Sequence, residues 1–376
     1  MTFYQTFHCL NKLEIKNQIV TASPDQVSDI LERGSWDVSD FPILISTAAE
    51  PFLKQMEEQS RRLTRLRHGH QMLLYAPLYI SNFCVNACVY CGFNVRNKIA
   101  RHTLNKKQVL LEARLLQSLG IKHILLVSGE SKKEVPVSYV EELAKSLSCM
   151  FSKISIEIYP LTEDEYRILA NAGVTGITIY QETYSQKLYP KYHRGPKADY
   201  INRINTPERA AQAGFSQLGI GSLLGLADPK MEMWAVAEHA NYLMERFESK
   251  KVSISFPRIR EAEGDFIPQA QVSDALLTQV IYAFRMALPD LDLVLSTREL
   301  PSFRDYLADR GITRMSAGSK TSPGGYALAD SLKMKDPLLN AKTGDVCPSL
   351  EQFSISDERS PEEMIAMLSS KGLKTQ

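Results

Sequence analysis

The sequence predicts a TIM-type (β/α)8 barrel, an α/β fold, with a helical N-terminal extension and a C-terminal extension. Eight short β-rich runs alternate with amphipathic helical segments over about 250 residues, which is the expected number of units for such a barrel. A doubly wound sheet also alternates, but no Gly-rich dinucleotide-binding turn follows the first run. We therefore expect an extension over 1–70, a barrel over 71–318 and a second extension over 319–376, packed on the barrel.

The N-terminal part is predicted to be helical. Ser23 is a good helix cap, Pro24 suits the first helical position, and Gln26 is placed to complete a capping box. Gly34 then provides a C-terminal stop. A second, charged helix is expected over about residues 50–67.

The eight strand–helix units of the barrel are predicted within the next 250 or so residues. Thr162 and Glu165 form a capping box, and Gly173 ends the helix that they begin. Helices are expected at 106–119, 136–148 and 162–171, and a last one near 361–370 in the otherwise turn-rich C-terminal part. The eight strands are expected at 72–80, 123–128, 153–159, 174–180, 217–224, 251–257, 291–297 and 312–317.

Composition and charge exclude several classes of protein. The 376 residues are 44% hydrophobic and 23% charged, with a net charge of +1, so no general attraction to nucleic acid or to anionic membranes is expected. No uncharged apolar run approaches the ~18 residues of a membrane span, and the first ten residues lack the apolar segment of a signal peptide. We expect a cytoplasmic protein with neither nucleic acid nor membrane as a partner.

Three of the six cysteines lie within eight residues, directly after the first predicted strand. Cys84, Cys88 and Cys91 have the spacing C-x3-C-x2-C, and Tyr90 precedes the third. Three thiolates hold a [4Fe–4S] cluster while leaving one iron free to bind a small molecule. A zinc site normally needs a fourth ligand, and a chance group of buried thiols would not explain the aromatic residue. A non-catalytic electron carrier or redox sensor is an alternative, although it usually has four protein ligands.

This motif after the first strand of a barrel resembles that of the radical S-adenosylmethionine superfamily. The resemblance is closest to its aromatic amino acid lyases, in particular the tyrosine lyases of thiamine biosynthesis. It implies a [4Fe–4S] cluster and S-adenosylmethionine as cofactors, and cleavage of the Cα–Cβ bond of L-tyrosine to 2-iminoacetate and 4-cresol. The matching stretches are residues 128–130, 157–160, 180–184, 192–196, 219–226, 255–258, 296–299 and 316–319.

The resemblance assigns several residues to S-adenosylmethionine. Gly129 and Glu130 match the motif that holds the methionine amino group; a glycine turn with a solvated glutamate is the alternative. Arg203 matches an arginine that pairs with the methionine carboxylate, or it is an exposed helix residue. Gly221 allows close approach to adenine, or it relieves crowding. Contacts with the cofactor are also expected from Tyr90, Gln181 and Glu182.

Glu157 and Tyr159 are predicted to face the cofactor from the third strand. Strand residues alternate between the two faces of a sheet, so both share one face with Ser155. A row of polar groups on the inner face of a barrel indicates ligand contact, whereas a satisfied core carboxylate is the alternative for Glu157.

The substrate residues and partners also come from the resemblance. Arg298 and Ser316 match the groups that bind the amino acid carboxylate, and we count them with Glu157 as catalytic residues; Arg258 and Arg260 are further candidates. The implied partners are thiazole synthase and a flavodoxin-type electron donor. A hydrogenase-maturation tyrosine lyase would need a second cysteine motif, yet only Cys347 follows Cys149. A tryptophan lyase would differ in its aromatic pocket.

Overall fold

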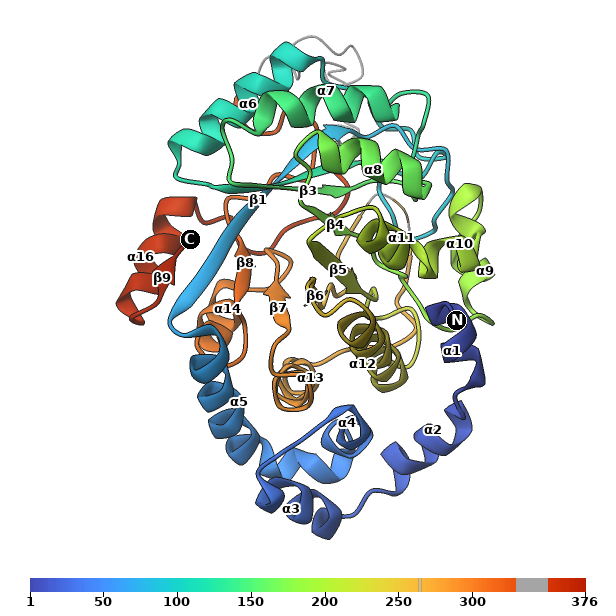
Figure 1. Ribbon diagram of the computed structural model, residues 1–376, viewed down its shortest axis with the longest axis vertical. Helices are drawn as coiled ribbons and strands as arrows, with labels where there is room; N and C mark the ends of the chain where they lie inside the picture. Colours follow the sequence, from blue (N-terminus) through green and yellow to red (C-terminus); the bar gives the residue numbers. More distant parts are fainter. Residues whose placement is uncertain (263, 265, 329–350) are drawn as a thin grey trace, which may run out of the picture.

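The protein, in a computed structural model, is a closed barrel of eight parallel strands (Figure 1). The structure describes all residues except 263, 265 and 329–350. Each strand pairs with the next one along the chain, and β1 closes the ring by pairing with both β8 and β2. The predicted (β/α)8 fold is confirmed. The strands are β1 (Gln71–Ser81), β2 (His123–Ser128), β3 (Lys153–Glu157), β4 (Gly176–Thr178), β5 (Gln217–Gly221), β6 (Lys251–Ser255), β7 (Asp292–Leu295) and β8 (Arg314–Ser316).

Six of the eight predicted strands, the third to the eighth, run past the observed C-terminal end. The sequence stays apolar there because the loops at this end of the barrel are themselves buried. Ile179 follows β4 and Phe256 follows β6, and both are core residues although the strand hydrogen bonds have ended. The pattern of apolar residues therefore located all eight strands, but for these six it did not predict where the strand hydrogen bonds end.

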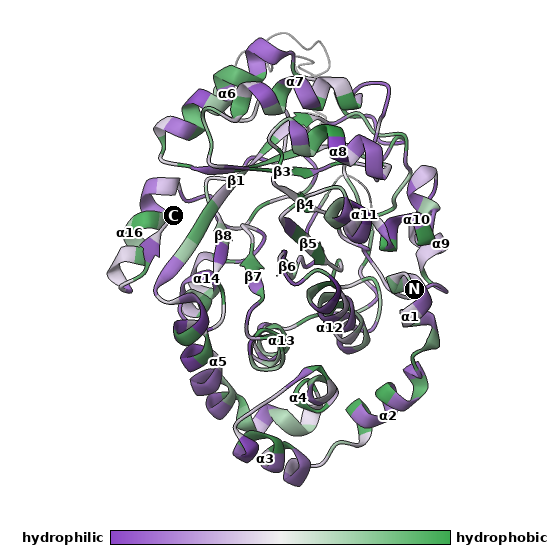
Figure 2. Ribbon diagram, in the orientation of Figure 1, coloured by the Kyte–Doolittle hydropathy of each residue, from purple (hydrophilic) through white to green (hydrophobic). Residues whose placement is uncertain are grey.

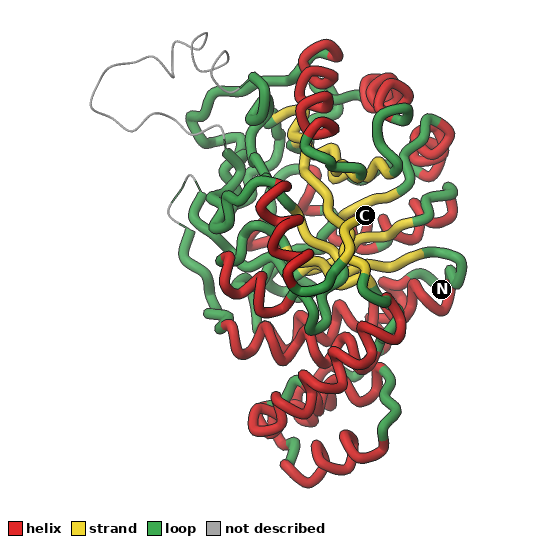
Figure 3. Tube along the Cα trace, turned by 90° about the vertical axis from the view of Figure 1, so that its left-hand side faces the viewer, coloured by secondary structure: helices red, strands yellow, loops and turns green. Residues whose placement is uncertain are grey.

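Helices cover the outside of the barrel, and the loops at the carboxyl ends of the strands gather on one side of it (Figure 3). Val109 and Leu143 are examples of helix residues that are fully buried. The connection from β4 to β5 carries three short helices where a barrel unit usually has one. These are α9 (Tyr189–Tyr192), α10 (Tyr200–Ile204) and α11 (Thr206–Gln212); the others are α6 (Lys106–Ser118), α7 (Val137–Leu147), α8 (Glu163–Asn171), α12 (Pro229–Arg246), α13 (Asp274–Ala287) and α14 (Pro301–Leu307).

The N-terminal extension wraps around the outside of α12 and α13 (Figure 1). Two of its helices, α3 and α5, were predicted, whereas α1, α2 and α4 were not. Helices α1 and α4 have seven and four residues, and α2 buries only Ile19, so none of the three gives a clear amphipathic pattern. Phe3 of α1 stacks on His239 of α12 with ring centroids 3.9 Å apart. Helix α5 packs on α13 and is mostly hydrophilic (Figure 2). The extension comprises α1 (Phe3–Cys9), α2 (Lys12–Thr21), α3 (Pro24–Arg33), α4 (Phe41–Leu44) and α5 (Leu53–His68).

The capping box of α3 forms as predicted, and its contribution can be measured. The Ser23 hydroxyl accepts from the Gln26 N–H, and the Gln26 side chain accepts from the Ser23 N–H. Ser23→Ala is expected to lower the free energy of unfolding by about 1 kcal/mol, because a helix N–H loses its partner. Ser28→Ala, inside the same helix, serves as the control in parallel urea titrations. An equal loss in both variants would contradict a specific contribution from the cap.

The C-terminal extension packs against the barrel at two places. Helix α16 (Pro361–Ser370) lies as predicted, and the short strand β9 (Lys374–Thr375) pairs with the start of β1. Residues 351–357 cross the carboxyl-terminal mouth of the barrel, where Ser356 N donates to Thr297 O. No helix in the described part of the chain is long and apolar enough to cross a membrane.

Candidate active site

The three motif cysteines lie on an irregular loop that follows β1 at the mouth of the barrel. Neighbouring loops hold this segment through its backbone: Val85 N donates to Glu130 O (3.1 Å) and Ala87 N to Arg194 O (3.0 Å). Arg101 also holds the loop, because its side chain donates hydrogen bonds to the carbonyls of Asn82 and Phe93. The loop is thereby fixed without regular secondary structure, as irregular backbone at a functional site requires.

Cys84, Cys88 and Cys91 line one cavity of about 510 Å³. Among the described residues no three acidic, cysteine or histidine side chains converge as a single metal ion requires. The three thiolates of a cubane site bind three different irons, so the arrangement fits a cluster better than a lone ion. Burial raises the pKa of the Cys91 thiol to about 11 and that of Cys88 further, which iron coordination would have to overcome.

Glu130 and Arg203 form a buried ion pair at the edge of this cavity. The Arg203 Nη1 lies 2.8 Å from Glu130 Oε1, its Nε donates to Tyr180 O, and Asn86 donates to the other Glu130 oxygen. Burial works to raise the pKa of Glu130, but Arg203, Lys197 and Asn86 together outweigh burial, and the pKa lies below its ordinary value. Neither the solvated glutamate nor the exposed arginine considered as alternatives is present.

Glu182 and Lys197 form a second pair beside the first. The Lys197 Nζ lies 2.6 Å from Glu182 Oε1, and Arg203 approaches the same oxygen at 3.7 Å. Glu182 has a φ of +69°, an uncommon value for a residue with a side chain, which aims its carboxylate into the site. Burial and the nearby Arg203 oppose the charge on Lys197, yet Glu182 and the other negative groups around it together hold the pKa of this lysine above its ordinary value.

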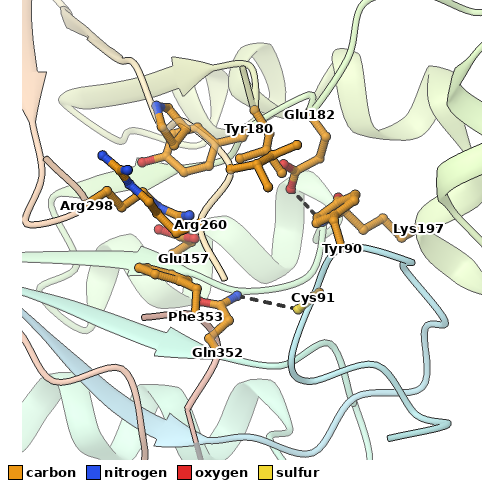
Figure 4. Close-up of a pocket in the computed structure, with 13 residues that line it drawn as sticks. Tyr90, Cys91, Glu157, Tyr180, Glu182, Lys197, Arg260, Arg298, Gln352 and Phe353 are labelled. Atoms are coloured by element: carbon orange, nitrogen blue, oxygen red, sulfur yellow. Dashed lines mark hydrogen bonds and ion pairs between the residues drawn. The ribbon is translucent and has the colours of Figure 1, made fainter. Parts of the chain in front are cut away.

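Glu157, at the end of β3, lies between the cysteines and the opposite wall of the barrel (Figure 4). Burial, followed by the nearby Glu182 carboxylate, raises its pKa to about 7. It lines the cavity of the cysteines and the two neighbouring cavities as well. Glu157 is thus placed to hydrogen-bond a ligand, rather than being satisfied within the core.

The raised pKa of Glu157 predicts a pH-dependent stability. The folded protein retains this proton up to about pH 7, whereas the unfolded chain releases it near 4.5. The stabilisation is therefore complete below pH 4.5 and is lost as the pH rises to about 7. The full effect is about 3 kcal/mol. Glu157→Gln should flatten this part of the profile in chemical unfolding of the cofactor-free protein at pH 5 and pH 8; parallel profiles for the two proteins would contradict the prediction.

Arg298 and Ser316 line a cavity of about 580 Å³ on the opposite side of Glu157. The Arg298 guanidinium lies 3.3 Å from the centre of the Phe353 ring, and one nitrogen donates to Arg258 O. Ser316 Oγ accepts from Thr297 N at 3.0 Å, which fixes the hydroxyl next to the arginine loop. Aromatic side chains from several strands complete the walls of this cavity: Tyr75, Tyr79, Tyr180 and Phe256.

The remaining predicted cofactor residues are placed differently. Tyr90 lines the site and donates to, or accepts from, His193 Nε2 at 2.8 Å, and Gly129 lines the cysteine cavity. Tyr159 and Gln181 do not line these cavities: the Tyr159 hydroxyl donates to Val135 O, and the Gln181 amide points to Tyr200 O. The face alternation predicted for Tyr159 fails because β3 ends at residue 157.

Gly221 likewise lies outside the cavity lining, and its small size has a packing explanation. A Cβ on Gly221 would lie 2.5 Å from Ser255 O, so the crowding alternative accounts for this glycine. The two arginines after β6 both pair with Glu299, and Arg258 also pairs with Asp274, but only Arg260 lines the site.

Among the residues of the site that were not predicted are Lys197, Gln352 and Phe353. Lys197 directly follows the matching stretch 192–196, so its charge next to a conspicuous motif was a usable indication. Gln352 and Phe353 come from the C-terminal extension and line the cavity beside Cys91 and Arg298 (Figure 4). No periodicity or motif marks them, because their position depends on how the extension crosses the barrel.

Two family models match this chain: the radical SAM superfamily over residues 78–240 and the Biotin and Thiamin Synthesis associated domain over residues 255–374. The fold and the site define a radical S-adenosylmethionine barrel enzyme, which confirms the [4Fe–4S] cluster and S-adenosylmethionine as its cofactors. The chain is 37% identical to 2-iminoacetate synthase of Escherichia coli K12, over 99% of this chain and 95% of that protein, and 36% identical over the same shares to the Salmonella typhimurium LT2 protein. It belongs to the 2-iminoacetate synthase family.

Solved structures agree with this assignment. A crystal structure of HydG, a maturase of the [FeFe]-hydrogenase, superimposes with a TM-score of 0.86 at 29% identity, covering 97% of this chain and 80% of HydG. HydG from Carboxydothermus hydrogenoformans gives 0.82 at 30% identity, covering 100% of this chain and 83% of that one.

Proposed function

We propose that this chain is a 2-iminoacetate synthase that cleaves the Cα–Cβ bond of L-tyrosine to 2-iminoacetate and 4-cresol for thiamine biosynthesis. One observation carries the proposal: Cys91 and Arg298 line the same cavity of about 530 Å³, with Glu157 between them. The cysteine that would hold the cluster and the arginine that would bind the amino acid carboxylate thus open onto one cavity (Figure 4).

The residues near the cysteines suit S-adenosylmethionine. When bound, the cluster and this cofactor supply a 5′-deoxyadenosyl radical that abstracts a hydrogen atom. The Glu130 carboxylate would accept from the methionine ammonium, and Arg203, which already bonds to Glu130, would pair with the methionine carboxylate. Glu157, Glu182 and Tyr90 line the adjoining cavity and would contact the rest of the cofactor. Because these groups already bond to one another, the site is organised before the cofactor binds.

Arg298 and Ser316 orient the substrate by its carboxylate. The Phe353 ring holds one face of the guanidinium, which leaves its planar edge to form two parallel hydrogen bonds. The aromatic ring of the substrate lies among the aromatic side chains of the 580 Å³ cavity.

The partners follow from the family. Thiazole synthase is the proposed recipient of the short-lived 2-iminoacetate, and a flavodoxin-type protein the proposed electron donor. We place the enzyme in the cytoplasm, in agreement with its near-neutral net charge and its cysteine motif.

Anaerobic assays of the reconstituted enzyme test the proposal. With S-adenosylmethionine, a reductant and L-tyrosine, equal amounts of 5′-deoxyadenosine and 4-cresol are expected. Deoxyadenosine without cresol would exclude tyrosine as the substrate, and L-tryptophan in its place then tests the related lyase activity. Absence of both products from fully loaded enzyme would refute the enzymatic assignment.

Arg298→Lys tests the carboxylate assignment. We expect the KM for tyrosine to rise about 10- to 100-fold, because the ammonium keeps the charge but loses the bidentate geometry. Arg114→Lys, at an exposed position in α6 outside the cavity lining, is the matched control. A KM for tyrosine that stays at the wild-type value in Arg298→Lys would contradict this role.

A further inference from the structure

A segment of the C-terminal extension spans the mouth of the barrel from the cysteine loop to β7. We call residues 351–357 the C-terminal strap. At one end, Gly92 N donates to Gln352 O (3.0 Å); at the other, Ser356 N donates to Thr297 O (2.8 Å). At the first end Gln352 N also donates to Thr321 O (3.0 Å), and between the two ends Ser354 N donates to Glu261 O (2.8 Å). Its backbone is therefore fixed on both sides of the site.

The strap comes as close to Cys91 as the backbone allows. A Cβ on Gly92, the residue after Cys91, would lie 2.5 Å from Glu351 O and 2.8 Å from Gln352 O. Only glycine permits this approach without displacement of the strap. The sequence Cys91-Gly92 thus combines a cluster ligand with the residue that seats the strap beside it.

Gln352 places its side-chain amide between two groups of the barrel. Tyr79 Oη lies 2.7 Å from Gln352 Oε1, and Gln352 Nε2 lies 3.9 Å from Cys91 Sγ. The contact with Tyr79 does not by itself fix which end of the amide is the oxygen, because a phenol can both donate and accept a hydrogen bond. A thiolate only accepts, so the N–H side must face Cys91 and the carbonyl side must face the phenol. The Phe93 backbone N–H also faces this sulfur.

From these contacts we propose that Gln352 is a positioning residue that donates its side-chain N–H to the Cys91 sulfur and thereby raises the reduction potential of the cluster. A donor at a ligand sulfur stabilises the additional negative charge of the reduced state, so the potential becomes less negative. Tyr79 acts through Gln352 by holding the amide in the donating orientation. Adjacent Phe353 contacts Arg298 instead, so one strap serves the cluster and the substrate carboxylate through neighbouring residues.

Redox titration of the reconstituted enzyme tests the proposal, with the reduced cluster followed by electron paramagnetic resonance. Gln352→Met keeps the volume of the side chain but has no N–H. We expect it to lower the ratio of reduced to oxidised cluster about tenfold at a fixed potential, a shift of 59 mV for one electron. Tyr79→Phe should shift the potential in the same direction by less. Phe353→Leu, also in the strap, should leave the potential unchanged and weaken tyrosine binding.

The outcomes separate this role from a structural one. Wild-type potential in Gln352→Met at full iron content would overturn the proposal, as would equal shifts in Gln352→Met and Phe353→Leu, since these would reflect a loosened strap. Should Gln352→Met bind no iron, Tyr79→Phe decides the question, and its wild-type potential would overturn the proposal. The inference rests on the proposed function only in naming the reaction that the cluster serves; the effect of Gln352 on the reduction potential does not depend on the substrate. The titration contains no tyrosine, so a missing 4-cresol product would refute that function and leave this result intact.

Discussion

Cys88→Ala is expected to abolish the iron–sulfur absorbance and to reduce formation of 5′-deoxyadenosine and 4-cresol below ~1% of wild type. Loss of a partner that only supports a metal ligand costs about 10- to 100-fold, so loss of a ligand itself exceeds this. Cys88 is the most buried of the three motif cysteines, with 5% of its surface exposed, and it lies in the middle of the loop. Iron content, absorbance and both products are measured on anaerobically reconstituted protein.

The fold should survive this substitution, which makes the result interpretable. The barrel core does not depend on the thiol, and removal of one buried sulfur costs about 1 kcal/mol. Cys149→Ala is the matched control because Cys149 is exposed after α7, far along the chain from the cluster loop. If Cys88→Ala still formed cresol at a rate above a few per cent of wild type, the assignment of the cluster to the three motif cysteines would be contradicted.

The sequence was sufficient for the parts of the site that one short motif determines. The cysteine spacing and the Gly129-Glu130 pair are local features, and both lie at strand ends whose position the barrel topology dictates. Arg203 was assigned from the resemblance, and the structure places it against Glu130, 73 residues earlier in the chain. The contact arises because the barrel brings the loop after β2 and the connection after β4 together at one end, which the distance between the residues in the sequence does not predict.

Other features of the site depend on irregular backbone. Glu182 was assigned from the resemblance, but it reaches the site through a left-handed conformation that no pattern of hydrophobicity reports. Tyr159 was expected to continue the alternation of β3, but the strand had already ended. Gln352 and Phe353 enter from the C-terminal extension by a path that depends on tertiary contacts alone. Periodicity predicts regular elements, and these residues belong to none.

Asp357→Ala is expected to lower the free energy of unfolding by about 3–5 kcal/mol, because it leaves a buried guanidinium without its counter-ion. Arg304 and Asp357 are both completely buried and form an ion pair between α14 and the end of the C-terminal strap. Arg304 also donates to the carbonyl of Ser316, at the site of the substrate carboxylate group. Burial already lowers the pKa of Arg304, which shows that water does not solvate its guanidinium well enough to replace Asp357.

Asp305→Ala is the control for this prediction. Asp305 also pairs with Arg359, the neighbour of the buried pair, but its side chain is 33% exposed, so a loss below about 1 kcal/mol is expected. The double variant Arg304→Leu with Asp357→Leu should recover most of the stability, since replacing both charges removes the need for solvation. Urea unfolding of the four proteins gives the comparison. A loss below about 1 kcal/mol in Asp357→Ala would show that the strap is not fastened by this pair. A large loss would explain how a segment without regular structure keeps Gln352 and Phe353 fixed over the barrel. Releasing the strap would separate Asp357 from Arg304 and leave the buried guanidinium without its counter-ion.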